Sequence, residues 1–239
     1  MANKQISISE PVTELKRVKI VDSGEPLVDY LDLCPDLVKA KPFFHYRYET
    51  VVRESVARML CAASGALASG YRLGVLEGWR PKHIQRRMYM RAWNRFKDRH
   101  PDWSDVQLKR VVNRYVAPMN DRVPPPHSTG AAVDLFLLDA DANELDMREP
   151  FDVQDPKAFL FDANGLTESA RERRAIFADA LLEGGLTNYP SEYWHWSYGD
   201  QGWAYRTGAP NAIYGVTEPQ NYEPDPKDVT DDPVEFAGR

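Results

Sequence analysis

The sequence predicts an α+β fold: a single domain with a small, mostly antiparallel sheet flanked by helices. Its 239 residues suit one domain with extensions, and a chain of this size buries roughly 70–75% of its unfolded surface. Segments with helical and with strand character alternate irregularly, without the regular strand–helix–strand repeat of a parallel α/β sheet. We find neither an internal repeat nor a low-complexity block before the C-terminal region.

The first part of the chain is predicted to be irregular and then to form a helix and a strand. Residues 10–45 carry several prolines, which favour short strands and loops over long helices. From Glu49 to Ser69, apolar residues recur at helical spacing, and Gly70 is a suitable residue to end that helix. The short apolar run Tyr71–Glu77 then reads as a strand.

Two further helices are expected before a rigid loop. Lys82–Arg99 is rich in Arg and Met and stops near Pro101. Ser104 is a suitable N-cap for a helix over Asp105–Tyr115. The three consecutive prolines at 124–126 each fix φ, so this stretch is predicted to be a non-helical loop.

The second half is predicted to contribute two strands and a helix. Ala131–Leu138 is the strongest strand candidate of the chain, and Asp139–Asn143 resembles its turn. Thr167–Glu183 reads as a helix that is capped by Thr167 or by Asn164 and closed by two glycines. Tyr193–Tyr198 is rich in aromatic residues and is interpreted as a strand.

The polar composition changes after residue 215. We therefore expect a domain over residues 1–215 and an acidic, proline-containing tail over 216–239. The tail has too few apolar residues to order itself, so it should be extended or disordered unless it lies along the domain.

Composition excludes several classes of protein. The formal net charge of −6 and the lack of a basic stripe argue against nucleic-acid binding. The most apolar stretch, Val56–Leu67, is shorter than a membrane span and is interrupted by an arginine. Cys34 and Cys61 are too few for a disulfide framework, and the N-terminus has no apolar signal core. We expect a cytoplasmic protein without a nucleic-acid or membrane partner, and its oligomeric state is not encoded.

The segment from His127 to Asp134 is the first of three with chemical potential. Imidazole nitrogens and carboxylate oxygens both bind zinc. Aspartate is depleted in strands, so Asp134 inside a run of apolar residues needs an explanation. A local cap or salt bridge at Asp134 would explain it equally well.

The second segment carries Glu192 and His195. A His and a carboxylate three residues apart can supply a metal ligand and a general base. Positions i and i+3 of an ideal strand point to opposite faces, so this role requires a bulge or bend at Tyr193–Trp194. The alternative is an aromatic core strand in which His195 only forms hydrogen bonds.

The third segment is Glu77-Gly-Trp-Arg-Pro81. An arginine directly after a strand and before a proline can present a rigid guanidinium to a cleft, with Glu77 as the partner that holds it. Most such arginines form structural ion pairs, and Arg80 taken alone has that explanation too.

Together, the three segments resemble the zinc D-alanyl-D-alanine dipeptidases, the family that includes the vancomycin-resistance dipeptidase. That family carries Ser-x-His-x-x-Gly-x-Ala-x-Asp, then Glu-x-x-His some sixty residues on, with Tyr-Arg-Pro upstream. This chain has Pro125-Pro-His-Ser-Thr-Gly-Ala-Ala-Val-Asp134, Glu192-Tyr-Trp-His195 and Trp79-Arg-Pro81 in the same order. The resemblance spans about residues 75–204, and the joint pattern is far more specific than its parts.

The resemblance implies a zinc site at the sheet and a role for each matching residue. His127, Asp134 and His195 would hold one Zn²⁺ per chain and leave a fourth position open. Glu192 would be the general base, and Arg80 would stabilise the negative oxygen that forms during hydrolysis.

Four more residues are implied to surround that site. Glu77 would orient the guanidinium of Arg80. The indoles of Trp79, Trp194 and Trp196 would wall a dry pocket, in which such polar interactions become stronger. The substrate would be a small dipeptide such as D-Ala-D-Ala.

The chain departs from the family pattern at three positions. Pro125 replaces the family's serine, which removes a hydroxyl and a backbone donor where a dipeptide should lie. Trp79 replaces a tyrosine, and Glu77 replaces an aspartate. The zinc chemistry should survive these changes, but the dipeptide preference is left open.

Two other functions compete with the dipeptidase. Carboxypeptidases and cell-wall endopeptidases of the same superfamily share the zinc chemistry but act outside the cytoplasm. A zinc-bearing binding module without turnover should lack the base or the oxyanion donor, and this chain retains both Glu192 and Arg80.

Overall fold

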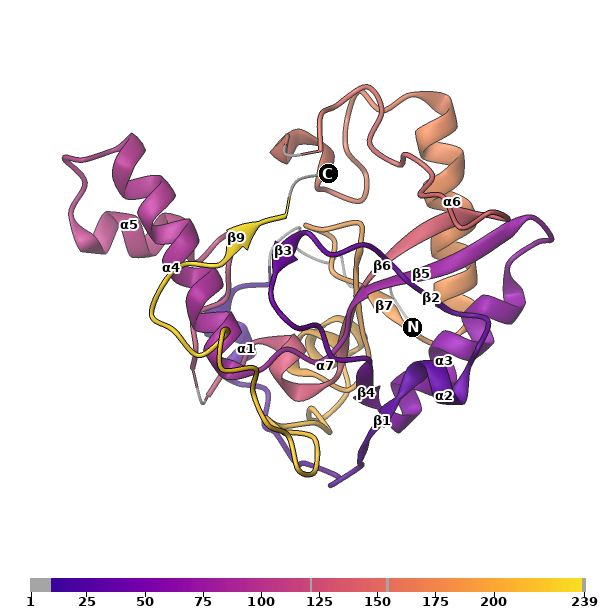
Figure 1. Ribbon diagram of the computed structural model, residues 1–239, viewed down its shortest axis with the longest axis horizontal. Coiled ribbons are helices and arrows are strands. Elements are labelled where there is room, and N and C mark those ends of the chain that lie inside the picture. The colour runs from indigo at the N-terminus through magenta and orange to yellow at the C-terminus, as the bar shows by residue number, and fades with distance from the viewer. Residues whose placement is uncertain (1–9, 121, 154, 238–239) are drawn as a thin grey trace.

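A five-stranded sheet forms the centre of the domain (Figure 1). The computed structural model describes residues 10–120, 122–153 and 155–237. In spatial order the strands are β2 (Val38–Lys39), β5 (Tyr71–Glu77), β6 (Ala132–Asp139), β8 (His195–Ser197) and β7 (Thr187–Asn188). β2 is parallel to β5 and the other pairs are antiparallel. The prediction of an α+β fold with a small, mostly antiparallel sheet is confirmed.

Short elements surround this sheet. Two antiparallel pairs lie outside it, β1 (Leu27–Asp29) with β4 (Val51–Arg53) and β3 (Phe44–His45) with β9 (Glu235–Phe236). The short helices are α1 (Val12–Leu15), α2 (Tyr30–Leu33) and α7 (Gln201–Thr207), and the 3₁₀ turns are η1 (Pro126–Thr129) and η2 (Pro156–Ala158).

The main core lies between one face of the sheet and two helices, α3 (Glu54–Ala66) and α6 (Glu168–Glu183), which pack against each other in Figure 1. Alternate residues of the two long central strands point to this face, as the period-two geometry of a strand requires. Its most deeply buried side chains include Val56, Leu60, Leu73, Val75, Val133, Leu135, Leu137, Phe177 and Leu181. The opposite face carries a smaller apolar cluster, and the candidate site lies on that side.

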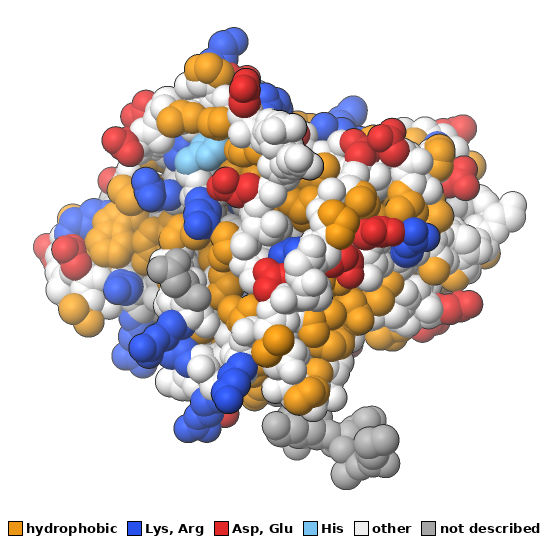
Figure 2. All heavy atoms as spheres, turned by 90° about the horizontal axis from the view of Figure 1, so that it is seen from below, with side chains coloured by type: hydrophobic (Ala, Val, Ile, Leu, Met, Phe, Trp, Pro, Cys, Tyr) orange, Lys and Arg blue, Asp and Glu red, His pale blue; other side chains and the backbone are white. Residues whose placement is uncertain are grey.

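A helical hairpin projects from the body of the domain (Figure 1). Its first helix, α4 (Lys82–Arg99), has the predicted bounds, and α5 (Asp105–Val112) begins with the predicted Ser104 cap, reinforced by Gln107 in a capping box. Figure 2 shows Lys and Arg side chains gathered at this end of the molecule. Within the described residues, no helix is both long enough and apolar enough to cross a membrane.

Several segments predicted to be regular have other bounds in the structure, and the helix expected over Asp105–Tyr115 ends at Val112. The helix expected from Glu49 begins only at Glu54, because Val51–Arg53 pairs with β1 instead. β-Branched residues fit this paired, half-buried strand well. The strand expected over Tyr193–Tyr198 is limited to His195–Ser197, because a turn precedes it.

The C-terminal segment, residues 216–237, runs along the domain near α4 (Figure 1). Its carboxylates and carbonyls bind arginines of the domain: Asp228 is 7% exposed and accepts hydrogen bonds from the backbone N–H of Arg47 at 2.8 Å and from Arg87 at 3.3 Å. Apolar contact is limited to a few residues, of which Val234 is fully buried against α4. Specific polar contacts thus hold a segment whose composition is mostly polar.

Asp228→Asn should destabilise the fold by about 1–3 kcal/mol, because it removes the negative charge that lies 3.3 Å from the buried guanidinium of Arg87. For a chain of this size this corresponds to a Tm lower by roughly 3–10 °C. Thermal unfolding measures the change. Asp231→Asn is the matched control, since Asp231 lies exposed in the same segment. Equal Tm values for both variants would contradict a stabilising role for the Asp228 contacts.

Candidate metal centre

The register of three neighbouring strands brings three of the residues named above side by side. β6 and β8 pair so that Asp134 stands opposite His195. On the other side of β6, an irregularity in β5 between Val75 and Glu77 places Glu77 opposite Asp134. Because side chains alternate between the two faces of a strand, this shift of one residue moves Glu77 to the face that carries Asp134.

His127 reaches the same place from the 3₁₀ turn η1, directly before β6. Gly130 ends this turn with φ of 71°, a left-handed conformation that favours glycine, and the chain then enters the strand. The Nδ1 atom of His127 lies 2.8 Å from the carbonyl oxygen of Gly78. Since a carbonyl only accepts, Nδ1 carries a proton, and Nε2, which faces Asp134, is the nitrogen that could bind a metal ion.

The side chains of His127, Asp134 and His195 form a cluster suited to a metal ion. One ligand atom from each lies within 4.8 Å of the other two, and the residues are 4%, 7% and 8% exposed. Asp134 Oδ1 is 3.4 Å from His127 Nε2 and 3.0 Å from His195 Nδ1. Burial acts to raise the pKa of Asp134, but the two histidines outweigh it and hold that pKa well below its usual range.

This donor set fits zinc. Two imidazole nitrogens and one carboxylate oxygen are the ligand types of catalytic zinc sites, which keep a fourth position open. The second contact of His127, to a backbone carbonyl, is the kind that fixes the orientation of a metal-binding imidazole. Among the described residues this is the one cluster of three such groups close enough to share an ion.

Glu192 lies beside this cluster because of a turn. The backbone N–H of His195 donates to the carbonyl of Glu192 at 3.1 Å, so the chain bends at Tyr193–Trp194, where the sequence interpretation requires a bend. Burial raises the pKa of Glu192 to about 7; the charge of Asp134 adds to this rise, while His195 and Arg80 oppose it. A carboxyl with such a pKa can both take up and release a proton near neutral pH.

Arg80 approaches the cluster from the end of β5. Its Nε donates to Glu77 Oε1 at 2.7 Å, and its Nη2 donates to Glu77 Oε2, a two-point contact that fixes the plane of the guanidinium. Its Nη2 also lies 4.0 Å from Asp134 Oδ2. The structure therefore brings Arg80, Glu77 and the three cluster residues together.

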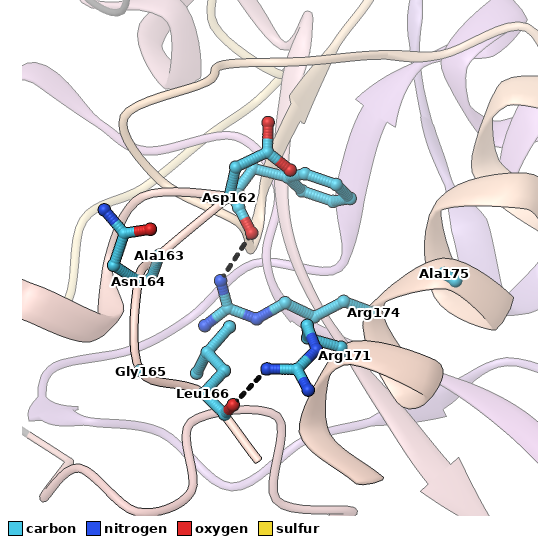
Figure 3. Close-up of a pocket in the computed structure, with 9 residues that line it drawn as sticks. Asp162, Ala163, Asn164, Gly165, Leu166, Arg171, Arg174 and Ala175 are labelled. Atoms are coloured by element: carbon cyan, nitrogen blue, oxygen red, sulfur yellow. Dashed lines mark hydrogen bonds between the residues drawn. The ribbon is translucent and has the colours of Figure 1, made fainter. Parts of the chain in front are cut away.

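Arg174 on α6 supports the turn that carries Glu192. Its guanidinium is 4.1 Å from the centre of the Tyr193 ring. It also donates to the backbone carbonyls of Met147, Ala158, Leu160 and Phe161 at 2.6–2.8 Å. Figure 3 shows Arg174 and Arg171 reaching from α6 to the loop that lines a cavity of about 380 Å³. Through these contacts a single buried side chain joins the loop at 147–161 to the turn before β8.

The three tryptophans named in the sequence analysis occupy different environments. Trp196 lies on the core face of β8, 1% exposed, with its ring centre 5.9 Å from that of Phe177. Trp79 is 2% exposed and donates its Nε1–H to the carbonyl of Thr217 at 2.8 Å. Trp194 is partly exposed and packs against both the main core and the smaller apolar cluster. The structure thus places Trp196 away from the metal cluster, on the opposite face of the sheet.

A comparison with protein families shows to which family this chain belongs. The family model described as D-ala-D-ala dipeptidase, of the M15 peptidases, matches residues 40–213. The chain belongs to this family. It is therefore a peptidase, and the resemblance read from the three short segments is confirmed.

Individual D-alanyl-D-alanine dipeptidases match over most of their lengths. That of Synechocystis sp. (strain ATCC 27184 / PCC 6803 / Kazusa) is 26% identical, over 84% of this chain and 93% of that protein. That of Enterococcus faecium is 27% identical, over 70% of this chain and 82% of that protein. The solved structure of the D,D-pentapeptidase VanY with Zn(II) aligns with a TM-score of 0.41 and 17% identity, over 72% of this chain and 90% of that one.

Several residues around the site of this M15 peptidase were not found by sequence reasoning. The hydroxyl of Tyr46 donates to Glu77, and the side chain of Gln85 accepts from Arg80. Glu10 forms a buried ion pair with Arg206 and carries a pKa raised by burial. Tyr46 lies 31 positions before its partner, so no local spacing could have indicated this contact.

Proposed function

We propose that this chain hydrolyses the peptide bond of D-alanyl-D-alanine in a zinc-dependent reaction. One observation carries the proposal: a half-buried carboxyl group with a raised pKa and a fixed guanidinium both lie beside a buried His–Asp–His cluster, in a member of the D-Ala-D-Ala dipeptidase family. These are the groups that hydrolysis of an amide needs, namely a metal site, a base and a donor for the developing negative charge.

His127, Asp134 and His195 would hold the ion. A zinc ion there would supply Lewis acidity, which would polarise a carbonyl group and lower the pKa of water. Glu192 takes up the proton that water releases as its oxygen attacks the carbonyl carbon. The same carboxyl then donates a proton to the nitrogen of the leaving amino acid, and burial, which raises the pKa of Glu192, favours this second step.

Arg80 serves the carbonyl oxygen. As the carbon–oxygen bond of the peptide loses double-bond character, negative charge collects on this oxygen, and the guanidinium can donate a charge-assisted hydrogen bond to it. The two-point contact with Glu77 fixes the guanidinium before substrate binds, so little reorganisation is required during the reaction.

Release of D-alanine from D-Ala-D-Ala by the zinc-loaded protein is the direct test. L-Ala-L-Ala and an N-acylated peptide ending in D-Ala-D-Ala should be assayed beside it. Fast cleavage of the free D,D-dipeptide and slow cleavage of the others supports the proposal. Preference for the acylated peptide would instead identify a carboxypeptidase, and no cleavage by a folded, zinc-loaded protein would refute the proposed activity.

The rate should fall on the acidic side of neutrality. Glu192 acts in its ionised form, so kcat/KM should drop about tenfold per pH unit below the pKa of this group. That pKa is about 7 in the metal-free protein, and a nearby cation favours the carboxylate. The acidic limb of the pH–rate profile should therefore lie at or below pH 7. The measurement is a pH profile with zinc content determined at each pH, which separates loss of the base from loss of the metal. A rate that stays constant from pH 7 to pH 4 at full zinc occupancy would exclude Glu192 as the base.

A further inference from the structure

Some N–H groups of the Arg80 guanidinium are bound within the protein, and others are not. Of the five N–H groups of an arginine, two are taken by Glu77, through Nε and Nη2. A third, on Nη1, donates to Gln85 Oε1 at 2.7 Å. One N–H on each terminal nitrogen is left, and Nη2 is also the atom that lies 4.0 Å from Asp134. Within the part of the chain that the structure describes, three hydrogen bonds hold the group and leave two N–H groups for a substrate.

The side chain of Gln85 connects Arg80 to the backbone through two hydrogen bonds. It lies in the first turn of α4, is 1% exposed, and donates through Nε2 to the backbone carbonyl of Ala117 at 2.7 Å. Arginine only donates hydrogen bonds and a carbonyl only accepts them. The amide oxygen of Gln85 must therefore face Arg80, and its nitrogen must face Ala117. The position thus requires one acceptor and one donor on the same short side chain, and an ionised glutamate lacks the donor.

The charge of this bridge is as important as its shape. Glu77 is a full carboxylate partner of Arg80, and a second one at the same distance as Gln85 would cancel more of the positive charge that the reaction uses. An amide oxygen accepts the hydrogen bond without adding a formal charge. Gln85 can therefore fix the guanidinium and leave its charge available.

We propose that Gln85 is a positioning residue for Arg80, which anchors the guanidinium to the backbone at Ala117 and does so without neutralising it. The effect on turnover rests on the proposed function, but the anchoring does not. The two parts can therefore be tested separately.

The anchoring is tested by NMR of the arginine side chains in the zinc-loaded full-length protein. Hindered rotation about the Cζ–Nη bonds reports the contacts of the guanidinium, and the signals of Arg80 are assigned with Arg80→Lys. Gln85→Met keeps the length and removes both hydrogen bonds, so the rotation of Arg80 should become faster. Gln201→Met is the matched control, because Gln201 is also a buried amide that donates to backbone carbonyls, those of Leu15, Val18 and Arg122, but does not contact Arg80.

The role in turnover is tested by kinetics on the same proteins. Gln85→Met should lower kcat by about 10- to 50-fold and change KM by less than about threefold, because a misplaced donor weakens transition-state binding more than ground-state binding. In an Arg80→Ala background the same substitution should cause little further loss, as residues acting through one another are not additive. Gln85→Glu keeps an acceptor for Arg80 but adds a negative charge and loses the donor to Ala117, so rotation of Arg80 should stay hindered by the new ion pair while kcat falls.

The outcomes distinguish the two proposals. Unchanged Arg80 rotation in a folded Gln85→Met protein overturns the anchoring, whatever the enzyme cleaves. Faster rotation in a wild-type protein that cleaves no D-Ala-D-Ala supports the anchoring and refutes the proposed function. If Gln85→Met does not fold, Gln85→Glu decides: hindered rotation with reduced kcat supports the proposal, and full kcat overturns the role of the neutral amide.

Discussion

Glu192→Gln should lower kcat for D-Ala-D-Ala by about 10³-fold while the zinc content remains one ion per chain. An amide has the shape of the carboxylate but cannot take up a proton from water, and general bases commonly contribute factors of 10²–10⁴. The three cluster residues do not include Glu192, so the metal site should stay intact. Steady-state kinetics and metal analysis on the same sample measure both expectations.

The same substitution should stabilise the metal-free fold, and the gain should depend on pH. Burial raises the pKa of Glu192 to about 7, against roughly 4.3 in an unfolded chain. The folded state therefore favours the neutral carboxyl, and wild type loses stability as the pH rises from about 4.5 to 7. Glu192→Gln lacks this loss, so its Tm should equal that of wild type near pH 4.5 and exceed it by several degrees at pH 8.

A control variant distinguishes the specific effect of losing Glu192 from the general effect of losing one carboxylate. Glu183→Gln removes an exposed carboxylate at the end of α6, and it should change neither kcat nor the dependence of Tm on pH. Substantial turnover by Glu192→Gln at full zinc content would assign the proton transfer to another group. Equal Tm values for Glu192→Gln and wild type at pH 8 would mean that the carboxyl is not held in a neutral-favouring environment.

Local signals in the sequence were sufficient for the long elements. The bounds of α4 and β5 agree with the prediction, because apolar periodicity and the flanking glycine and proline all act within a few residues. The Ser104 cap was found for the same reason, and the structure selects Thr167 from the two caps that the sequence offered for α6. Where a segment pairs with a distant strand, as Val51–Arg53 does with β1, the local helical pattern was misleading.

The site was recognisable because its residues fall in three short segments, but its geometry depends on features outside them. The irregularity in β5 that turns Glu77 toward Asp134 has no signature in the apolar run around it. The bend before His195 was recognised as a requirement, but its support by Arg174 was not, since that contact depends on the docking of α6. Gln85 lies in a helix whose spacing predicts only a buried face.

The hydrogen bonds around Arg80 connect these observations. Tyr46 binds Glu77, Glu77 and Gln85 bind Arg80, and Gln85 binds the chain beyond α5. The guanidinium is thus held from several segments that are far apart in sequence. A site built this way is rigid before substrate arrives, which is the condition for electrostatic stabilisation of a transition state.

Arg80→Ala should lower kcat by about 10²–10³-fold, the usual cost of losing one donor to a developing oxyanion, with a smaller change in KM. Among the described residues, the buried Glu77 carboxylate would then keep Tyr46 alone as a side-chain hydrogen-bond partner, so the Tm should also fall. Arg80→Lys keeps the charge but cannot bind both oxygens of Glu77 and also Gln85 through a planar group, so we expect it to recover only part of the rate.

Chemical rescue decides whether this loss concerns the guanidinium itself. Added guanidinium ion at millimolar concentration should raise kcat of Arg80→Ala several-fold, because the cavity left beside Glu77 keeps its carboxylate and the amide of Gln85. The same ion should not help Glu192→Gln, in which the missing group is a base. If Arg80→Ala retains wild-type kcat, or if both variants respond equally to the ion, Arg80 does not donate to the oxyanion. In that event its contacts with Glu77 serve only the stability of the end of β5.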